Sequence, residues 1–129
     1  MNIDFSRAVD GVARRTEDSV RGWIARNLAA DNFEKEIGEA LAKGSPYMTM
    51  AMSGVVPKEL LENNKQFQES KAAFLAAGGK SVVIKDLKDF DDDWGDIGEP
   101  QTQVYFWLVE PPTTFFQRQA FEWKYGLKP

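Results

Sequence analysis

The segment from Thr102 to Glu110, TQVYFWLVE, constrains the fold more than any other part of the sequence. Apolar residues occupy both its odd and its even positions, so a strand here would carry apolar side chains on both faces. Such a strand has to be covered from both sides, and we expect it at the centre of a sheet. Pro111 and Pro112 follow directly and predict its end.

An amphipathic helix is predicted over residues 4–29. At about 100° per residue, the apolar side chains of this segment gather on one side. They are Phe5, Val9, Val12, Ala13, Thr16, Val20, Trp23 and Ile24.

Two more helical segments follow. Asp31 and Glu34 have the spacing of a capping box, so we expect a helix from there to Lys43, with Gly44 as its left-handed terminator. Its inward residues would be Phe33, Ile37 and Leu41. A further helix should begin at Pro57 and run to Gly78-Gly79, with its apolar residues at helical spacing.

The remaining strands are predicted from period-two patterns. Met48, Met50 and Met52 alternate with small or polar residues in an uncharged stretch, and residues 81–87, SVVIKDL, form a second strand. We also expect a strand over residues 117–125, where aromatic and charged residues alternate. Helices that precede strands in this order indicate an α+β fold, with N-terminal helices packed on one face of a small antiparallel sheet formed mainly by the C-terminal half. The 129 residues suit a single domain, with 111–129 as a docking tail.

The chain contains no cysteine and no histidine. Disulfides, thiolate nucleophiles, Cys/His zinc sites and a Ser-His-Asp triad are therefore excluded. The commonest general base near neutral pH is also absent. Composition thus favours a function other than catalysis, and we expect no cofactor.

An acidic segment spans residues 86–99 and holds seven carboxylates against one lysine. Its spacing fails the EF-hand pattern, because a loop that starts at Asp89 has Trp94 at the glycine position and Pro100 at the final one. An irregular calcium site, paired carboxylates for hydrolysis and a solvated turn that faces a basic partner all remain open. As a partner-binding surface this segment would offer Phe90, Asp91, Asp92, Asp93, Trp94 and Asp96.

A second charged surface is predicted opposite the apolar side of the first helix. It consists of Arg7, Arg14, Arg15, Arg21 and Arg26. Five arginines could contact phosphate, but the acidic isoelectric point of about 4.9 and the lack of a reading motif argue against nucleic acid. The arginine face and the acidic segment are opposite in sign, so contact between copies would be head-to-tail.

Aromatic residues concentrate near the C-terminus, where the last 40 residues contain ten of the sixteen. The tail contributes Phe115, Phe116, Phe121, Trp123 and Tyr125 as candidate partner-binding residues. A tail this aromatic has to dock, either on its own sheet or on a neighbouring subunit.

These patterns favour a non-catalytic protein–protein interaction or assembly protein, either a homo-oligomer or part of a larger complex. A virus or phage particle component and an inhibitor with an acidic surface fit this description. One alternative is a small-ligand module or carboxylate hydrolase, with a pocket of Met50, Met52, Trp107 and Trp123 beside the loop aspartates; another is a calcium-binding domain. No signal peptide or membrane segment is visible, so a cytoplasmic location, or a virion, is expected.

Overall fold

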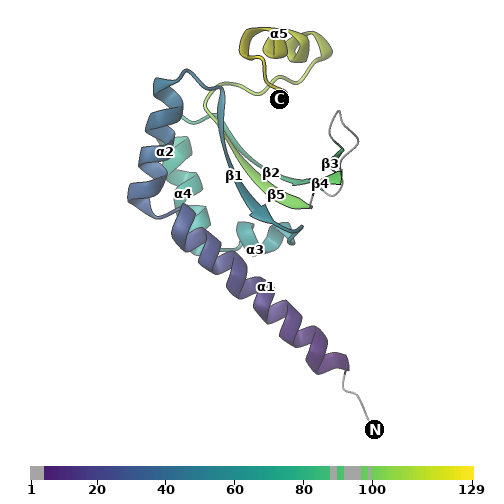
Figure 1. Cartoon of the computed structure of the whole chain (residues 1–129). Helices are drawn as coiled ribbons and strands as arrows, with labels where there is room; N and C mark the ends of the chain where they lie inside the picture. Colours follow the sequence, from purple (N-terminus) through teal and green to yellow (C-terminus); the bar gives the residue numbers. More distant parts are fainter. Residues whose placement is uncertain (1–4, 88–89, 92–96, 99) are drawn as a thin grey trace.

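The computed structural model describes residues 5–87, 90–91, 97–98 and 100–129, and the side chains of residues 16–86 and 100–129. Three antiparallel strands form a sheet in the order β1-β5-β2 (Figure 1). They are β1 Tyr47–Ser53, β2 Ser81–Leu87 and β5 Gln101–Trp107. The predicted central strand is therefore confirmed, although it ends at Trp107 rather than at Glu110.

Four helices precede β5 in the chain and one follows it, which confirms the α+β class. The helices are α1 Phe5–Asn27, α2 Ala30–Ala42, α3 Lys58–Glu62, α4 Lys65–Ala76 and α5 Phe115–Tyr125. Within the acidic segment, β3 Phe90–Asp91 pairs with β4 Ile97–Gly98, so part of the expected loop is a two-stranded ribbon.

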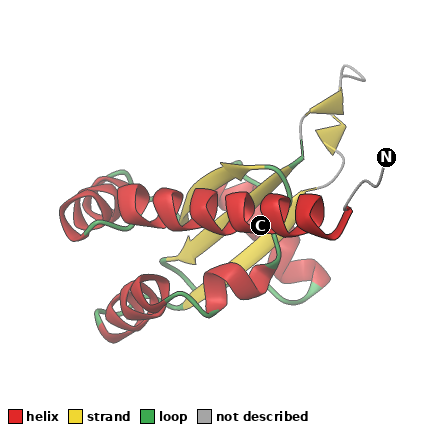
Figure 2. Ribbon diagram, turned by 90° about the horizontal axis from the view of Figure 1, so that it is seen from below, coloured by secondary structure: helices red, strands yellow, loops and turns green. Residues whose placement is uncertain are grey.

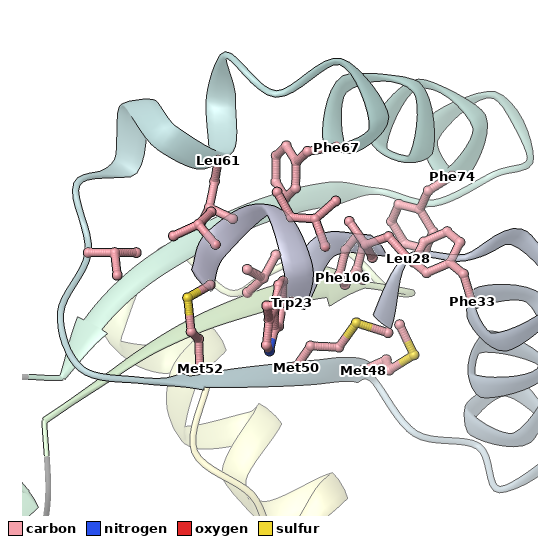
Figure 3. Packing of buried hydrophobic residues seen from close by; sticks show 14 residues of the cluster. Trp23, Leu28, Phe33, Met48, Met50, Met52, Leu61, Phe67, Phe74 and Phe106 are labelled. Atoms are coloured by element: carbon pink, nitrogen blue, oxygen red, sulfur yellow. The ribbon is translucent and has the colours of Figure 1, made fainter. Parts of the chain in front are cut away.

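One face of the sheet carries the core. The register places Met48 opposite Phe106 and Met50 opposite Val104, and all four side chains are buried. Figure 3 shows the three methionines of β1 reaching toward the aromatic and aliphatic side chains of α1 to α4. Flexible thioethers fill such irregular spaces well, and the predicted methionine face is confirmed as core.

Helix α1 packs on the core face of the sheet and contacts the edge strand β1. Val20, Trp23 and Ile24 are buried, as their spacing predicted. The indole N–H of Trp23 donates to the carbonyl of Ala51 at 2.9 Å, which satisfies a backbone group of this edge strand. The N-terminal end of α1 extends beyond the sheet (Figure 1, Figure 2).

Both expected glycine terminators are confirmed. Gly44 (φ 69°) and Gly78 (φ 113°) follow α2 and α4 in the left-handed region, and paired backbone hydrogen bonds close a Schellman motif at each end. A helix thus precedes Gly78-Gly79 and strand β2 follows, which is the reverse of the order that a phosphate-binding loop requires.

Two helix predictions are wrong in detail. The single helix expected from Pro57 is two helices, because the Asn64 side chain accepts from the Phe67 N–H and caps a new start at α4. Asp31 does not cap α2, since the helix already begins at Ala30 and Asp31 lies in its first turn. There its carboxylate still interacts favourably with the positive end of the helix dipole.

Thr102 is the one fully buried polar side chain among the described core residues. Its hydroxyl donates to the Gly54 carbonyl at 2.9 Å and accepts from the Val56 N–H at 3.0 Å. It therefore fixes the chain that leaves β1 against the start of β5.

We expect Thr102→Val to lower the free energy of unfolding by about 2–4 kcal/mol, because it keeps the volume but removes the partner of the buried Val56 N–H and of the partly buried Gly54 carbonyl. Thr102→Ser keeps the hydroxyl and removes one methyl, so its cost should be about 1 kcal/mol. Urea unfolding of both variants measures the difference. Equal losses for Val and Ser would show that the hydroxyl does not hold this connection.

Candidate functional site

The second face of the sheet carries an aromatic cluster. Alternation along β1 and β5 places Tyr47, Tyr105 and Trp107 opposite the methionine side. The Tyr47 ring lies 5.2 Å from the Tyr105 ring and 4.9 Å from the Trp107 ring, both edge-on. This geometry is favourable for aromatic pairs and gives the sheet a rigid second surface.

Helix α5 docks on this cluster, away from the other helices. Phe121 is buried, and its ring centroid lies 6.3 Å from that of Tyr47 and 5.6 Å from that of Trp107. Tyr125 packs against Phe121 at 4.8 Å. Figure 1 shows α5 standing apart from α2 and α4, beside the C-terminus. The tail thus docks on its own sheet through one side of α5.

The last residues fasten the end of this helix. The Tyr47 hydroxyl donates to the Lys128 carbonyl at 2.9 Å, and the Lys85 ammonium donates to a Pro129 oxygen at 3.3 Å. Lys85 also lies 4.4 Å above the Tyr105 ring. The C-terminal residues therefore lie across the aromatic face.

The prediction of a strand over residues 117–125 is wrong, because this segment belongs to helix α5. Thr114 and Gln117 form a reciprocal capping box at its start, and Gly126 (φ 67°) ends it in the left-handed region. Both signals are visible in the sequence, but the aromatic alternation outweighed them. A strand would have placed Phe121, Trp123 and Tyr125 on one side, whereas the helix separates Trp123 from the other two.

Three aromatic side chains consequently face solvent. Trp123 is 94% exposed, Phe116 is 82% exposed and Phe115 is 69% exposed. Phe116 and Trp123 lie seven residues apart, about two helical turns, so they share one side of α5. We call these three residues the aromatic patch.

The other predicted partner surfaces are described only in part. Arg21 and Arg26 are exposed, and Arg21 lies 3.7 Å from Asp18 in a solvent-exposed pair. The side chains of Arg7, Arg14 and Arg15 lie outside the described residues. The side chains of Phe90, Asp91, Asp92, Asp93, Trp94 and Asp96 also lie outside the described residues. The acidic partner surface and the alternative of a calcium site in this segment therefore stay predictions.

A groove of about 650 Å³ lies between α2 and α4. Phe33 and Phe74 form its floor, and both rings pack edge-on against Phe106 of β5, at 5.0 and 5.4 Å. Leu41 was predicted to point inward, but it is 60% exposed and lines the groove, as does the half-buried Ile37. Sequence periodicity found these apolar positions and could not show that α4 leaves a gap above them.

The residues named for the pocket of the small-ligand alternative do not come together. Met50 and Met52 lie in the core on one side of the sheet, Trp107 lies on the other side, and Trp123 is in solvent. Among the residues whose placement is described, no three carboxylates gather in a way that could hold a metal ion. Across that part of the chain, no helix combines the length and the apolar character needed to cross a bilayer.

Comparison with known proteins yields no relative: no family model, no curated protein and no solved structure matches this chain.

The two sides of α5 should respond differently to truncation. Phe121→Ala removes the ring that holds α5 on Tyr47 and Trp107, and we expect a loss of about 3 kcal/mol or release of α5. Phe116→Ala is the matched control on the exposed side and should change stability by less than about 0.5 kcal/mol. Hydrogen exchange of residues 115–125 reports the release. Equal exchange in the two variants would contradict docking through Phe121.

The aromatic face should also make stability fall at high pH. Burial raises the pKa of Tyr47 above its ordinary 10.0, with a further increase from neighbouring Tyr105, and burial raises the pKa of Tyr105 as well. The unfolded chain then loses these protons first, so their contribution is complete below pH 10.0 and disappears as pH rises through the raised values.

Lys85 acts in the opposite sense, because burial and then the charge of Arg118 lower its pKa below 10.5. The Tyr47→Phe/Tyr105→Phe variant keeps Lys85 and so isolates the phenols. Between about pH 9 and about pH 11, its melting temperature should fall less than that of the wild type. An identical fall in both proteins would exclude the two phenols as the cause.

Proposed function

We propose that this chain is a non-catalytic protein–protein interaction protein that assembles with copies of itself or within a larger complex, and that α5 is its docking element. The observation that carries the proposal is the aromatic patch, with Trp123 at 94% exposure. One side of α5 is buried against its own sheet, and the other exposes three aromatic rings to water, as is typical of a surface that contacts another protein.

The free energy available from the patch is considerable. Moving one large apolar side chain from water to an interface contributes about 1.5–3 kcal/mol, so three rings could supply several kcal/mol. Aromatic side chains also dominate the energetics of protein interfaces. Among the described residues, the Trp123 side chain makes no ring contact and no hydrogen bond, and Phe115 and Phe116 contact one another.

The docking of α5 also lowers the conformational entropy that this helix would lose on binding a partner, which supports the same proposal. Capping at both ends and the contacts of Phe121 fix the helix before any partner arrives. A pre-formed element loses less conformational freedom on binding than a tail that folds at that moment. The exposed cations Arg21 and Arg26 would add an electrostatic attraction to the acidic segment 86–99 of another copy, and salt would screen this attraction.

A small-ligand module is the second candidate, and the groove between α2 and α4 favours it. Its volume of about 650 Å³ lies in the range of ligand pockets, and its floor is apolar. The carboxylates that line it, Glu34 and Glu69, are exposed at the rim. A hydrolase would need a sequestered acid, so the groove supports binding without catalysis.

Self-association tests the leading proposal. The wild-type chain should form oligomers from micromolar to near-millimolar concentration in light scattering. Phe116→Gln/Trp123→Gln, which introduces good helix formers at exposed positions, should weaken association at least about 100-fold, because two anchors are lost. Arg118→Gln is the matched control, because it places the same side chain at an exposed position of α5, about 160° around the helix from Phe116 and about 140° from Trp123; it should associate as the wild type does.

Salt separates the contributions of the patch and the charges. Oligomers held by aromatic burial should persist at high salt, whereas those held by exposed charges should dissociate. A wild-type chain that stays monomeric at low and high salt over the whole concentration range would refute self-assembly.

A further inference from the structure

We infer that the aromatic patch of α5 docks into the groove between α2 and α4 of a second copy, so that the chain assembles head-to-tail. The inference rests on the proposed self-association and names the surface that receives the helix. Both halves of the contact are present on one chain: an unpartnered helix side and an apolar groove of about 650 Å³. An amphipathic helix in such a groove is a recurrent mode of recognition.

The dimensions of the two halves agree. Helix α5 has 11 residues, and the groove walls α2 and α4 have 13 and 12. At 1.5 Å per residue these are about 17, 20 and 18 Å long. Complete burial of three aromatic rings would contribute at most roughly 450–750 Å² on the helix side, so flanking residues of α5 have to supply the rest of the ~800 Å² per partner of a standard interface.

The chemistry of the surfaces is complementary as well. The rings of the patch would meet the Phe33 and Phe74 floor and the Ile37 and Leu41 wall. Glu34 and Glu69 are the charged residues that line the groove, and both are acidic. On α5, Lys124 follows Trp123 directly and is exposed. Glu122, which is also exposed, precedes Trp123, so the patch has one basic and one acidic flank. In the proposed contact the Lys124 flank faces Glu34 and Glu69.

Gly38 leaves room for a close approach to α2. It lies inside this helix and lines the groove, although glycine disfavours the helical state relative to alanine. A Cβ added at Gly38 would meet nothing within 4 Å, so packing within the chain does not require glycine there. A helix of another copy that enters the groove would occupy the space that a side chain at position 38 would fill, and this explains a glycine there.

The same chain cannot supply the helix while α5 stays docked. Phe121 fixes α5 on the Tyr47–Trp107 side of the sheet, whereas Phe33 and Phe74 pack on the Phe106 side. The patch and the groove therefore lie on opposite faces of one sheet and meet only between copies. Such a contact is heterologous, and it builds a ring if the rotation closes and a filament if it does not.

Complementation between two blocked variants tests this arrangement. Phe116→Gln/Trp123→Gln removes the two most exposed rings of the patch, and Gly38→Gln/Ala73→Gln fills the groove from two positions that line it. Glu39→Gln/Lys71→Gln is the matched control, since it places the same side chain at exposed positions of α2 and α4 that do not line the groove. Circular dichroism establishes that each variant is folded.

We expect each blocked variant alone to associate at least about 100-fold more weakly than the wild type, and the control to be unchanged. An equimolar mixture of the two should form a heterodimer and nothing larger, because it contains one intact helix and one intact groove. Lys124→Glu should weaken association more strongly at low salt than at high salt, because salt screens the repulsion between the new carboxylate and the acidic residues of the groove.

The outcomes separate the two proposals. Association that survives groove filling but not patch removal would overturn the groove as receptor and leave α5 as the docking element, in contact with another surface. A wild-type chain that is monomeric would overturn the groove contact and the self-association on which it rests. If that monomer instead carries a small apolar molecule that Gly38→Gln/Ala73→Gln releases, the groove belongs to a ligand.

Discussion

Burial of β5 from both sides is the constraint on which the structure depends. Val104 and Phe106 point to one face of the sheet, and Tyr105 and Trp107 point to the other. Since both sets need cover, the four N-terminal helices occupy the first face and α5 with the C-terminal residues occupies the second. The positions of the groove and of the aromatic patch both follow from this division.

The first face shows how a groove arises from an incomplete layer. Phe33 and Phe74 converge on Phe106, and these three rings bring α2 and α4 to the same strand. The two helices make few contacts with each other beyond this point, so a strip of apolar surface stays open above the rings. The second face is covered by a single helix, which cannot bury both of its own sides. Each layer thus ends in apolar surface, and our proposals connect these two surfaces between copies.

Much of the fold could be predicted because it depends on local pattern. The strands at Met48–Met52, at 81–87 and in the centre were found from alternation and from apolar runs, and Gly44 and Gly78 from helix-ending chemistry. The break at Asn64 and the helical state of 115–125 were missed. In both places a short polar cap competes with a longer hydrophobic pattern, and the cap prevails because it satisfies backbone groups that the pattern leaves out.

The sequence by itself determined that β5 is central, that most of the helices precede this central strand, and that imidazole and thiol chemistry are absent. It also singled out the aromatic residues of the tail as candidate partner-binding residues, which stays a prediction. Only the tertiary structure decided which of them are inward, because a helix at 100° per residue turns Phe121 and Tyr125 toward the sheet and Trp123 away from it. It alone revealed the groove, since a gap between two helices depends on how both pack on a third element and is written in neither helix.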